Sequence, residues 1–286
     1  MKRILIAALL FTAALACKKR DEAPVEPPPA PKPAVMQTKA DDSQKKLATP
    51  QPSVTLAAGA PIPANGVALW LQGDDARAGK VAAWANPLVA NVTATAASAA
   101  EQPEAVAGAL NGHTVIRFDG DKNMLMTNID ISPARMPEAT IIAVFSSKAD
   151  APTPLRKLYG DDNGAYDRAA GIDNRAEGKN YTLFTGKGVE GDFQLEKEKP
   201  YLTVDQLGAK DVSTWVNGHA TLARVETDYG EALPNMYIGG TGTSYHEPWM
   251  GDVAEIIVYA RALTDQERTQ VEDYLAHKYA LTLQRP

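Results

Sequence analysis

Three carboxylates lie close together in the stretch Glu190-Gly191-Asp192-Phe193-Gln194-Leu195-Glu196. Two carboxylates that flank a glycosidic bond can cleave it when they stand within about 10 Å of each other. On a regular strand Glu190 and Glu196 would share a face, but about 20 Å apart at about 3.3 Å per residue. This spacing is too long for glycoside cleavage, so we expect no catalysis at these residues.

Other catalytic motifs are missing from the sequence. The chain has no Gly-x-Ser-x-Gly nucleophile elbow and no His-Glu-x-x-His metal-binding motif. Its four histidines, His113, His219, His246 and His277, are scattered along the sequence. The sequence therefore leaves open whether the protein is an enzyme, and it favours binding over catalysis.

Oxygen ligands gather in one loop, where Asp161, Asp162, Asn163 and Asp167 surround Gly164. Such a composition is typical of calcium loops, although the spacing and the terminal glutamate of an EF-hand are missing. The same residue types also make ordinary turns. Two interpretations stay open here, a Ca²⁺ site and a plain turn, and no other cofactor is indicated.

A second loop, residues 243–250, combines the aromatic and polar side chains of Tyr245, His246 and Trp249. Sugars bind to such combinations, because a ring stacks on the C–H face of the sugar while polar groups bind its hydroxyls. These three residues are our candidate ligand-binding site. The alternative for Trp249 is a place in the core.

The N-terminus has the pattern of an export signal. Met1-Lys2-Arg3 is basic, and residues 4–16 form an apolar run that is too short to span a bilayer. The stretch Ala13-Ala14-Leu15-Ala16-Cys17 resembles the lipobox of bacterial lipoproteins. That resemblance implies a signal peptide over 1–16 and acyl chains, such as palmitate, on Cys17, the only cysteine. Lys18, in place of an aspartate, implies the outer membrane.

The chain after Cys17 divides into a tether and one domain. Residues 17–65 hold ten of the twenty prolines and almost no large apolar side chain, which predicts a disordered tether. Residues 66–286 contain many short β-prone runs bounded by Gly, Pro, Asn or Asp, among them 67–71, 80–84, 115–120, 140–145, 181–184, 201–204 and 235–239. We expect one large all-β domain there, in which residues 90–109 form a loop with one short strand.

The charge of residues 66–286 excludes one class of partner. This part of the chain carries 30 acidic and 20 basic side chains, so its net charge is about minus ten. A negative domain without a basic cluster is a poor binder of nucleic acid. Nucleic acid is therefore not an expected partner.

The end of the chain reads as a strand that leads directly into a helix. Residues 251–259 are rich in β-branched side chains, and Val271, Tyr274, Leu275 and Tyr279 then follow at helical spacing. Thr264 and Glu267 have the spacing of a capping box. We expect the helix to begin there, with His277 on its solvent-exposed side.

This strand and helix resemble the end of the laminin-G-like, concanavalin A-like lectin domains of bacterial exported proteins, whose last strand reads G-[DE]-[IV]-A-E-[IV]-x-[IV]-Y-x-R-A-L. Earlier segments, such as 67–71, 115–120 and 215–218, are similar to the same family. The resemblance implies a jelly-roll sandwich of two antiparallel sheets with one C-terminal helix. Relatives with this fold often bind a Ca²⁺ ion on the rim of the sandwich, so the resemblance also favours a Ca²⁺ site here, without locating its ligands.

The sequence predicts an exported protein that is lipid-anchored at the cell envelope, in the outer membrane. Its expected activity is non-catalytic, lectin-like binding of a carbohydrate or surface ligand. Two alternatives remain. The domain could be a structural or protein-interaction module that binds a cell-envelope or extracellular protein, or it could be a diverged glycan-active enzyme.

Overall fold

The computed structural model describes residues 56, 59–86, 92–151, 153–161, 168–174, 178–229, 234–242 and 247–285, all within one compact unit, Thr49–Pro286. The described elements are β1 (Val67–Gln72), η2 (Gly73–Asp75), β2 (Gly79–Lys80), β3 (Ala83–Ala85), β4 (Thr93–Thr95), η3 (Ala99–Glu101), β5 (Glu104–Leu110), β6 (His113–Asp119), β7 (Leu125–Thr127), β8 (Ala139–Ser147), β9 (Arg156–Gly160), β10 (Ala169–Ile172), β11 (Asn180–Phe184), β12 (Gly188–Gln194), β13 (Pro200–Leu207), β14 (Asp211–Val216), β15 (His219–Glu226), β16 (Tyr237–Ile238), β17 (Met250–Tyr259) and α1 (Asp265–Tyr279). No helix in this part of the chain is long and apolar enough to span a membrane.

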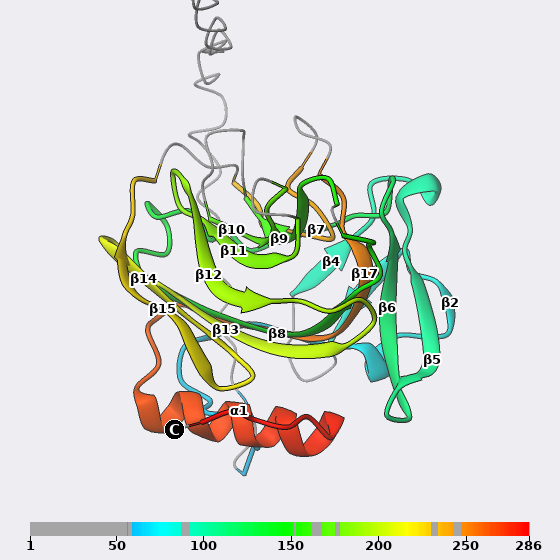
Figure 1. The fold of residues 1–286 in the computed structure, drawn as a ribbon. Helices are drawn as coiled ribbons and strands as arrows, with labels where there is room; N and C mark the ends of the chain where they lie inside the picture. The colour runs from blue at the N-terminus through cyan, green and yellow to red at the C-terminus, as the bar shows by residue number, and fades with distance from the viewer. Residues whose placement is uncertain are drawn as a thin grey trace, which may run out of the picture. The chain divides into compact units, whose positions relative to one another are not determined.

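The strands form two antiparallel sheets that pack face to face, and α1 lies on the outer side of one of them (Figure 1). Sheet A has the order β15-β14-β13-β8-β17-β6-β5-β2, and β1 also pairs with β17. Sheet B has the order β12-β11-β10-β9-β16-β7-β4-β3. This arrangement confirms the predicted fold class, an all-β sandwich of two antiparallel sheets with one C-terminal helix.

Strand β17 is the central strand of sheet A. It pairs with β1, β6 and β8, so three distant segments of the chain meet along it. Nine of its ten residues are buried, because one of its faces packs on sheet B and α1 covers much of the other. A strand that is buried on both faces carries apolar, β-branched side chains at nearly every position, which explains the sequence pattern that predicted this strand.

Helix α1 begins at the predicted capping box. The Glu267 backbone N–H donates to Thr264 Oγ1 at 3.3 Å, and the Thr264 backbone N–H donates to the Glu267 carboxylate at 3.0 Å. Arg261 binds the same carboxylate at 2.8 and 2.7 Å, and this pairing lowers the pKa of Glu267 to about 2. Leu275 is buried against the sandwich and His277 is exposed, as expected.

Two hairpins of sheet A turn at Asn-Gly pairs. The backbone angle φ is 47° at Asn111 and 84° at Gly112, and it is 49° at Asn217 and 79° at Gly218. A two-residue hairpin of the type that follows the twist of its strands needs positive φ at both positions, which Asn and Gly adopt at little cost. These turns join β5 to β6 and β14 to β15.

Two sequence expectations for the N-terminal half of the domain were wrong. The run 80–84 is not one strand, because β2 belongs to sheet A and β3 to sheet B, and the chain crosses between the sheets at Val81 and Ala82. The backbone N–H of Val81 donates to Pro103 O, whereas Ala82 O accepts from Ala96 N–H. Residues 90–109 also hold two strands, β4 and β5, where one was expected.

The core lies between the sheets and extends under α1. Its members include Leu69 and Trp70 of β1, Ile142 and Phe145 of β8, and Leu275 of α1. Ile62, within the stretch predicted as tether, is also buried in this core at 2% exposure. The packed domain therefore includes residues before position 66.

Candidate functional site

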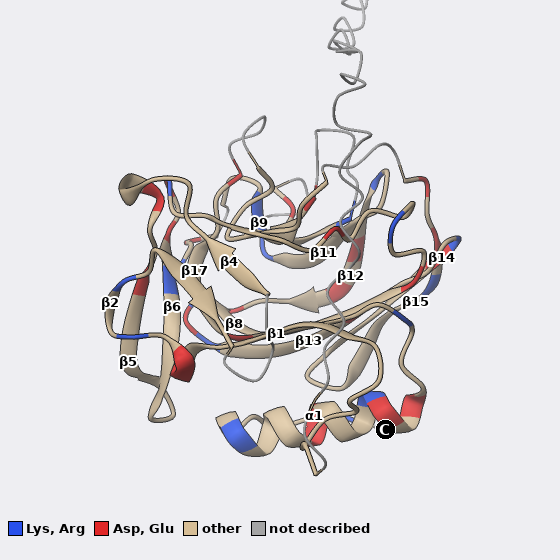
Figure 2. Cartoon of the chain, turned by 180° about the vertical axis from the view of Figure 1, so that it is seen from behind, with Lys and Arg blue, Asp and Glu red and all other residues tan. Residues whose placement is uncertain are grey.

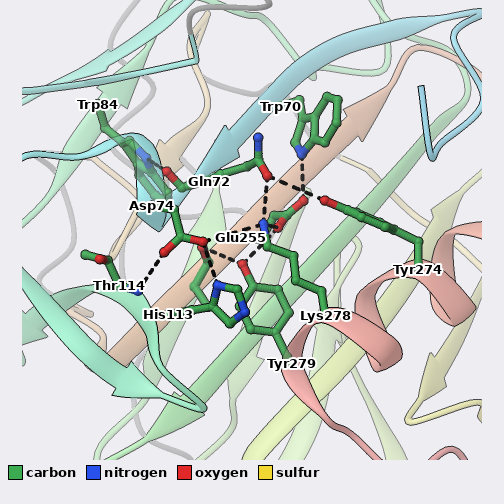
Figure 3. Close-up of polar contacts among 11 residues, drawn as sticks. Trp70, Gln72, Asp74, Trp84, His113, Thr114, Glu255, Tyr274, Lys278 and Tyr279 are labelled. Atoms are coloured by element: carbon green, nitrogen blue, oxygen red, sulfur yellow. Dashed lines mark hydrogen bonds and ion pairs between the residues drawn. The ribbon is translucent and has the colours of Figure 1, made fainter. Parts of the chain in front are cut away.

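A buried polar cluster joins α1 to sheet A (Figure 3). Glu255 of β17 accepts hydrogen bonds from Trp70 Nε1 at 2.6 Å, Lys278 Nζ at 2.7 Å and Tyr279 Oη at 2.8 Å. Its side chain is fully buried, and burial raises the pKa of its carboxyl group against the opposing effect of Lys278. Each carboxylate oxygen has a partner within the protein, so the cluster is a structural joint.

The charges continue from this joint to the surface. Lys278 Nζ lies 3.9 Å from Asp74 of η2, whose carboxylate also contacts His113 Nδ1 at 2.7 Å. Figure 2 shows this basic end of α1 beside the acidic η2. Thr114 N–H donates to the remaining oxygen of Asp74 at 2.8 Å. These alternating positive and negative groups attach the end of the helix to sheet A.

A second buried carboxylate connects the two sheets. Asp205 of β13 accepts hydrogen bonds from Tyr159 Oη at 2.8 Å, Tyr181 Oη at 2.6 Å and Thr214 Oγ1 at 2.8 Å. Tyr159 and Tyr181 come from sheet B, so the carboxylate links opposite layers. Burial raises the pKa of Asp205 to about 6. All four side chains are fully buried or nearly so, which places them out of reach of a ligand.

A row of side chains crosses the outer face of sheet B. Tyr237 of β16 pairs with Met126 of β7, Met126 pairs with Thr95 of β4, and Thr95 pairs with Ala83 of β3. Directly paired residues of adjacent strands point to the same face of a sheet. Their strand neighbours, such as Leu125 and Ile238, are fully buried in the core, so this row faces outward.

We call these four residues the Tyr237 row. Met126 is 39% exposed and is the one exposed large hydrophobic side chain among the described residues. Thr95 and Ala83 are exposed, and Tyr237 is half-buried, which raises the pKa of its hydroxyl. An aromatic ring next to a thioether, flanked by small side chains, offers a flat apolar surface that suits the C–H face of a sugar.

A pocket of about 260 Å³ opens at the end of β7 and β16, next to this row. We call it the rim pocket. Its lining includes Glu101, Lys122, Met124, Thr241 and Glu247. Met124 directly precedes β7, and Gly239 directly follows β16. The pocket therefore adjoins the ends of the two strands that carry Met126 and Tyr237.

Arg156 holds two walls of the rim pocket together. Its Nη1 donates to the carbonyl oxygen of Gly120 at 2.8 Å and to that of Pro248 at 2.9 Å. The turn before β7 is itself fixed, because Asp119 accepts hydrogen bonds from the backbone N–H groups of Asp121, Lys122 and Asn123. The pocket is therefore built from rigid segments, which lowers the cost of ordering them around a ligand.

Thr241 is the polar group of the pocket with unused bonding capacity. Its side chain is 1% exposed, and its Oγ1 forms no hydrogen bond within the described structure. A buried hydroxyl without a partner is unfavourable. The same burial keeps this oxygen out of reach of a ligand in the rim pocket, so Thr241 shapes the wall of the pocket without offering it a hydrogen bond.

The predicted aromatic loop lies next to this pocket. Tyr245 and His246 are outside the described residues. Trp249 is fully buried and meets Phe145 edge-on, with ring centroids 5.5 Å apart. A ring with no face open to solvent cannot stack on a sugar, so Trp249 belongs to the core and not to the candidate site. Glu247 and Pro248 of the same loop do line the pocket.

Of the candidate calcium ligands, only Asp161 falls within the described residues, and Asp162, Asn163 and Asp167 lie outside them. Asp161 is fully buried, and its Oδ1 accepts a hydrogen bond from the Arg168 backbone N–H at 3.0 Å. No group of three or more His, Cys, Asp or Glu side chains among the described residues could hold a metal ion. The Ca²⁺ site stays a prediction.

The three carboxylates near position 190 lie at an edge of sheet B. Glu190 and Asp192 are exposed on β12, whereas Glu196 follows the strand and pairs with Lys199 at 2.6 Å. Hydrogen bonds from Thr221 and His219 lower the pKa of Asp192. A general acid needs a raised pKa, so Asp192 does not have the environment of a glycosidase general acid.

No protein-family model and no curated protein sequence matches this chain. Solved structures do share its fold. A sialidase of Trypanosoma rangeli in complex with sialic acid has a TM-score of 0.54 at 17% identity, covering 80% of this chain and 36% of the sialidase. The receptor-binding domain of a botulinum neurotoxin C/D mosaic serotype has a TM-score of 0.51 at 10% identity, covering 73% of this chain and 51% of that domain.

These comparisons concern the fold alone, because the identities are low and the chain spans about a third of the sialidase length. They therefore do not select a site. Tyr237 and Met126 were not among the residues predicted from the sequence. A half-buried tyrosine and a methionine in short strands look like core residues, and only the pairing of β16 with β7 brings them together on an open face.

Proposed function

We propose that this protein is a non-catalytic carbohydrate-binding module of the laminin-G-like, concanavalin A-like lectin type. The sugar binds on the Tyr237 row and in the rim pocket. The observation that carries this proposal is the pairing of half-buried Tyr237 with exposed Met126 on the outer face of sheet B, beside a pocket at the ends of their strands. The sialidase with a similar fold was solved with sialic acid, which agrees with this class of function.

The sequence of the N-terminus supports a second part of the proposal. Cys17 follows an export signal within a lipobox, so we propose that the mature chain begins at a lipidated cysteine in the bacterial outer membrane. Several acyl chains hold a protein at a membrane far more firmly than one chain does. The proline-rich stretch after Cys17 then gives the sugar-binding domain reach away from the lipid surface.

Glycan binding can be tested with the detergent-solubilised full chain on a glycan array and by affinity electrophoresis in polysaccharide gels. Tyr237→Ala should weaken retention by about tenfold, because one stacking contact contributes roughly 1–2 kcal/mol. His277→Ala, on the exposed side of α1, is the matched control and should bind like the wild type. Equal binding by the wild type and Tyr237→Ala, at equal melting temperature, would contradict this site.

Enzymatic turnover of the bound polysaccharide is measured separately. We expect no release of reducing sugar from any polysaccharide that the protein retains. Release that disappears in Glu190→Gln would overturn the non-catalytic reading and favour a diverged glycan-active enzyme. Failure to retain any glycan would favour a structural or protein-interaction module.

The anchor is tested by Cys17→Ser. This change should move the protein from the membrane fraction to the soluble fraction, or leave its signal uncleaved, and the mass of the acyl chains should be lost. An unchanged mass and membrane fraction would exclude lipidation at Cys17.

A further inference from the structure

The Tyr237 row differs at its two ends, and this asymmetry bears on which part of a glycan the site binds. Resting on the proposed function, we propose that the site binds the end of a linear, uncharged glycan over about three sugar units. The terminal unit lies at Tyr237 and the rim pocket, and the rest of the chain leaves over β3.

One end of the row is open. β3 is the last strand in the order of sheet B, and its residue in the row, Ala83, is exposed. Ala85, two positions further along the same face, is exposed as well. Both side chains are methyl groups, so neither rises above the sheet to stop a chain that continues past this edge.

The other end is closed. Tyr237 also pairs with Gly160 of β9, and the backbone of this glycine is buried. A Cβ atom added to Gly160 would stand 2.5 Å from Ala169 Cβ and 3.2 Å from Thr241 Cγ2. Gly160 and Ala169, the next two paired positions beyond Tyr237, are both buried, so this part of the face is covered whereas the Ala83 end is exposed. A sugar chain cannot continue along the row past this point, but its last ring can turn towards the rim pocket.

The length of the open part fixes the number of units. From Ala83 to Tyr237 the row crosses four strands, which is three inter-strand steps of about 4.8 Å, or about 14 Å in total. One inter-strand step is close to the repeat of a pyranose unit in an extended chain. The row therefore accommodates about three units, and a fourth unit would project beyond the edge strand into solvent.

The polarity of the face indicates an uncharged chain. None of the four residues of the row carries a charge. The neighbouring row is also neutral, with Ala85 paired to Thr93, and Thr93 N–H donates to the Asn128 side-chain oxygen at 3.1 Å. An anionic sugar would lie here without a basic partner over its middle units. Amide and hydroxyl groups beside an apolar row match the hydroxyls of a neutral hexose chain.

The decisive experiment is a chain-length series measured by calorimetry with the detergent-solubilised full chain. The probes are linear β-1,3-, β-1,4- and α-1,4-gluco-oligosaccharides of one to six units, together with cyclic glucans of the same linkages. The affinity should rise about tenfold or more from one unit to three and then stay within about twofold from three to six. The cyclic glucans, which have no chain end, should bind at least tenfold more weakly than their linear counterparts.

Two substitutions test the two ends of the row separately. Ala83→Arg should place a long side chain across the open end, so it should reduce binding of the trisaccharide by about tenfold and leave binding of the monosaccharide unchanged. Met124→Ala removes an apolar side chain from the lining of the rim pocket, so it should weaken binding of every probe, including the monosaccharide. His277→Ala again serves as the control.

The outcomes separate this inference from the function on which it rests. Affinity that keeps rising through six units, or equal binding of cyclic and linear glucans, overturns end recognition and leaves the sugar-binding function intact. Tighter binding of sialylated or uronic acid oligosaccharides than of the neutral series overturns the uncharged ligand. Absence of binding by every sugar probe refutes the proposed function, and this inference with it.

Discussion

Lys278 of α1 donates a hydrogen bond of 2.7 Å to Glu255 of β17, across the boundary between the helix and sheet A. The lysine side chain is 14% exposed and the glutamate side chain is fully buried. The pair ties the last helix to the central strand of the sheet, and it keeps a buried carboxylate from being left without a countercharge.

Removing one member of this pair should be strongly destabilising. Glu255→Ala leaves Trp70 Nε1, Tyr279 Oη and the Lys278 ammonium group without their shared acceptor, which should cost about 3–5 kcal/mol. The double variant Glu255→Gln/Lys278→Met should lose less than the sum of its two single changes, because both remove the same interaction. Urea unfolding of the four proteins measures this coupling, and strict additivity would show that the two residues act independently.

The docking of α1 can be measured on neighbouring residues of the helix. Leu275→Ala should lower the free energy of unfolding by about 3 kcal/mol, because it opens a cavity at a fully buried position. His277→Ala, two residues further on the exposed side, should change it by less than about 0.5 kcal/mol. Thermal unfolding compares them directly, and equal melting temperatures would mean that the helix does not pack on the sandwich in solution.

Asp205 should give the fold a distinctive dependence on pH. Its folded pKa of about 6 exceeds the ordinary value of 3.8, so the folded state holds the proton more tightly than the unfolded state. The stability that comes from this proton is fully present below about pH 3.8 and is lost as the pH rises through 6. The loss amounts to about 3 kcal/mol for a fully buried carboxyl group.

Asp205→Asn removes this titration while keeping the size of the side chain. The stability of the variant relative to the wild type should therefore increase by up to about 3 kcal/mol between pH 4 and pH 7, measured by urea unfolding at several pH values. Leu275→Ala, which removes no titratable group, should differ from the wild type by a constant amount over the same pH range. A constant difference between Asp205→Asn and the wild type at all pH values would contradict the raised pKa.

The end of α1 offers a stabilising change. Ala280 adopts the left-handed conformation with φ of 52°, where its Cβ is strained and glycine is the usual residue. Ala280→Gly should raise the free energy of unfolding by about 0.5–1 kcal/mol. Ala276→Gly, inside the same helix, should lower it by about 1 kcal/mol. A fall in melting temperature for both variants would show that the left-handed cap is not formed in solution.

Local sequence patterns predicted the parts of the fold that depend on local interactions. The capping box at Thr264 and the buried strand 250–259 need only neighbours along the chain to be recognised, and both are present. The crossing at Val81 and Ala82 was missed, because adjacent residues there form hydrogen bonds with different sheets. Alternation of apolar residues does not tell which sheet a two-residue strand joins.

The candidate site depended on information of a longer range. Tyr237 and Met126 lie more than a hundred residues apart, and the register of β16, β7 and β4 sets them side by side. Trp249 was the more obvious candidate because it stands in a polar loop, yet its ring fills the core next to Phe145. The sequence identified the loop as a candidate without revealing that the Trp249 side chain is buried.

The place of β17 in sheet A also bears on when this protein can fold during its synthesis. β1, β6 and β8 are all made early, but the strand that joins them ends only at Tyr259. Until that segment emerges from the ribosome, sheet A lacks its central strand and the core cannot close. Long-range strand pairing of this kind is slow to form. Sheet A can therefore be completed only after the residues up to Tyr259 have been made, however early its other strands appear.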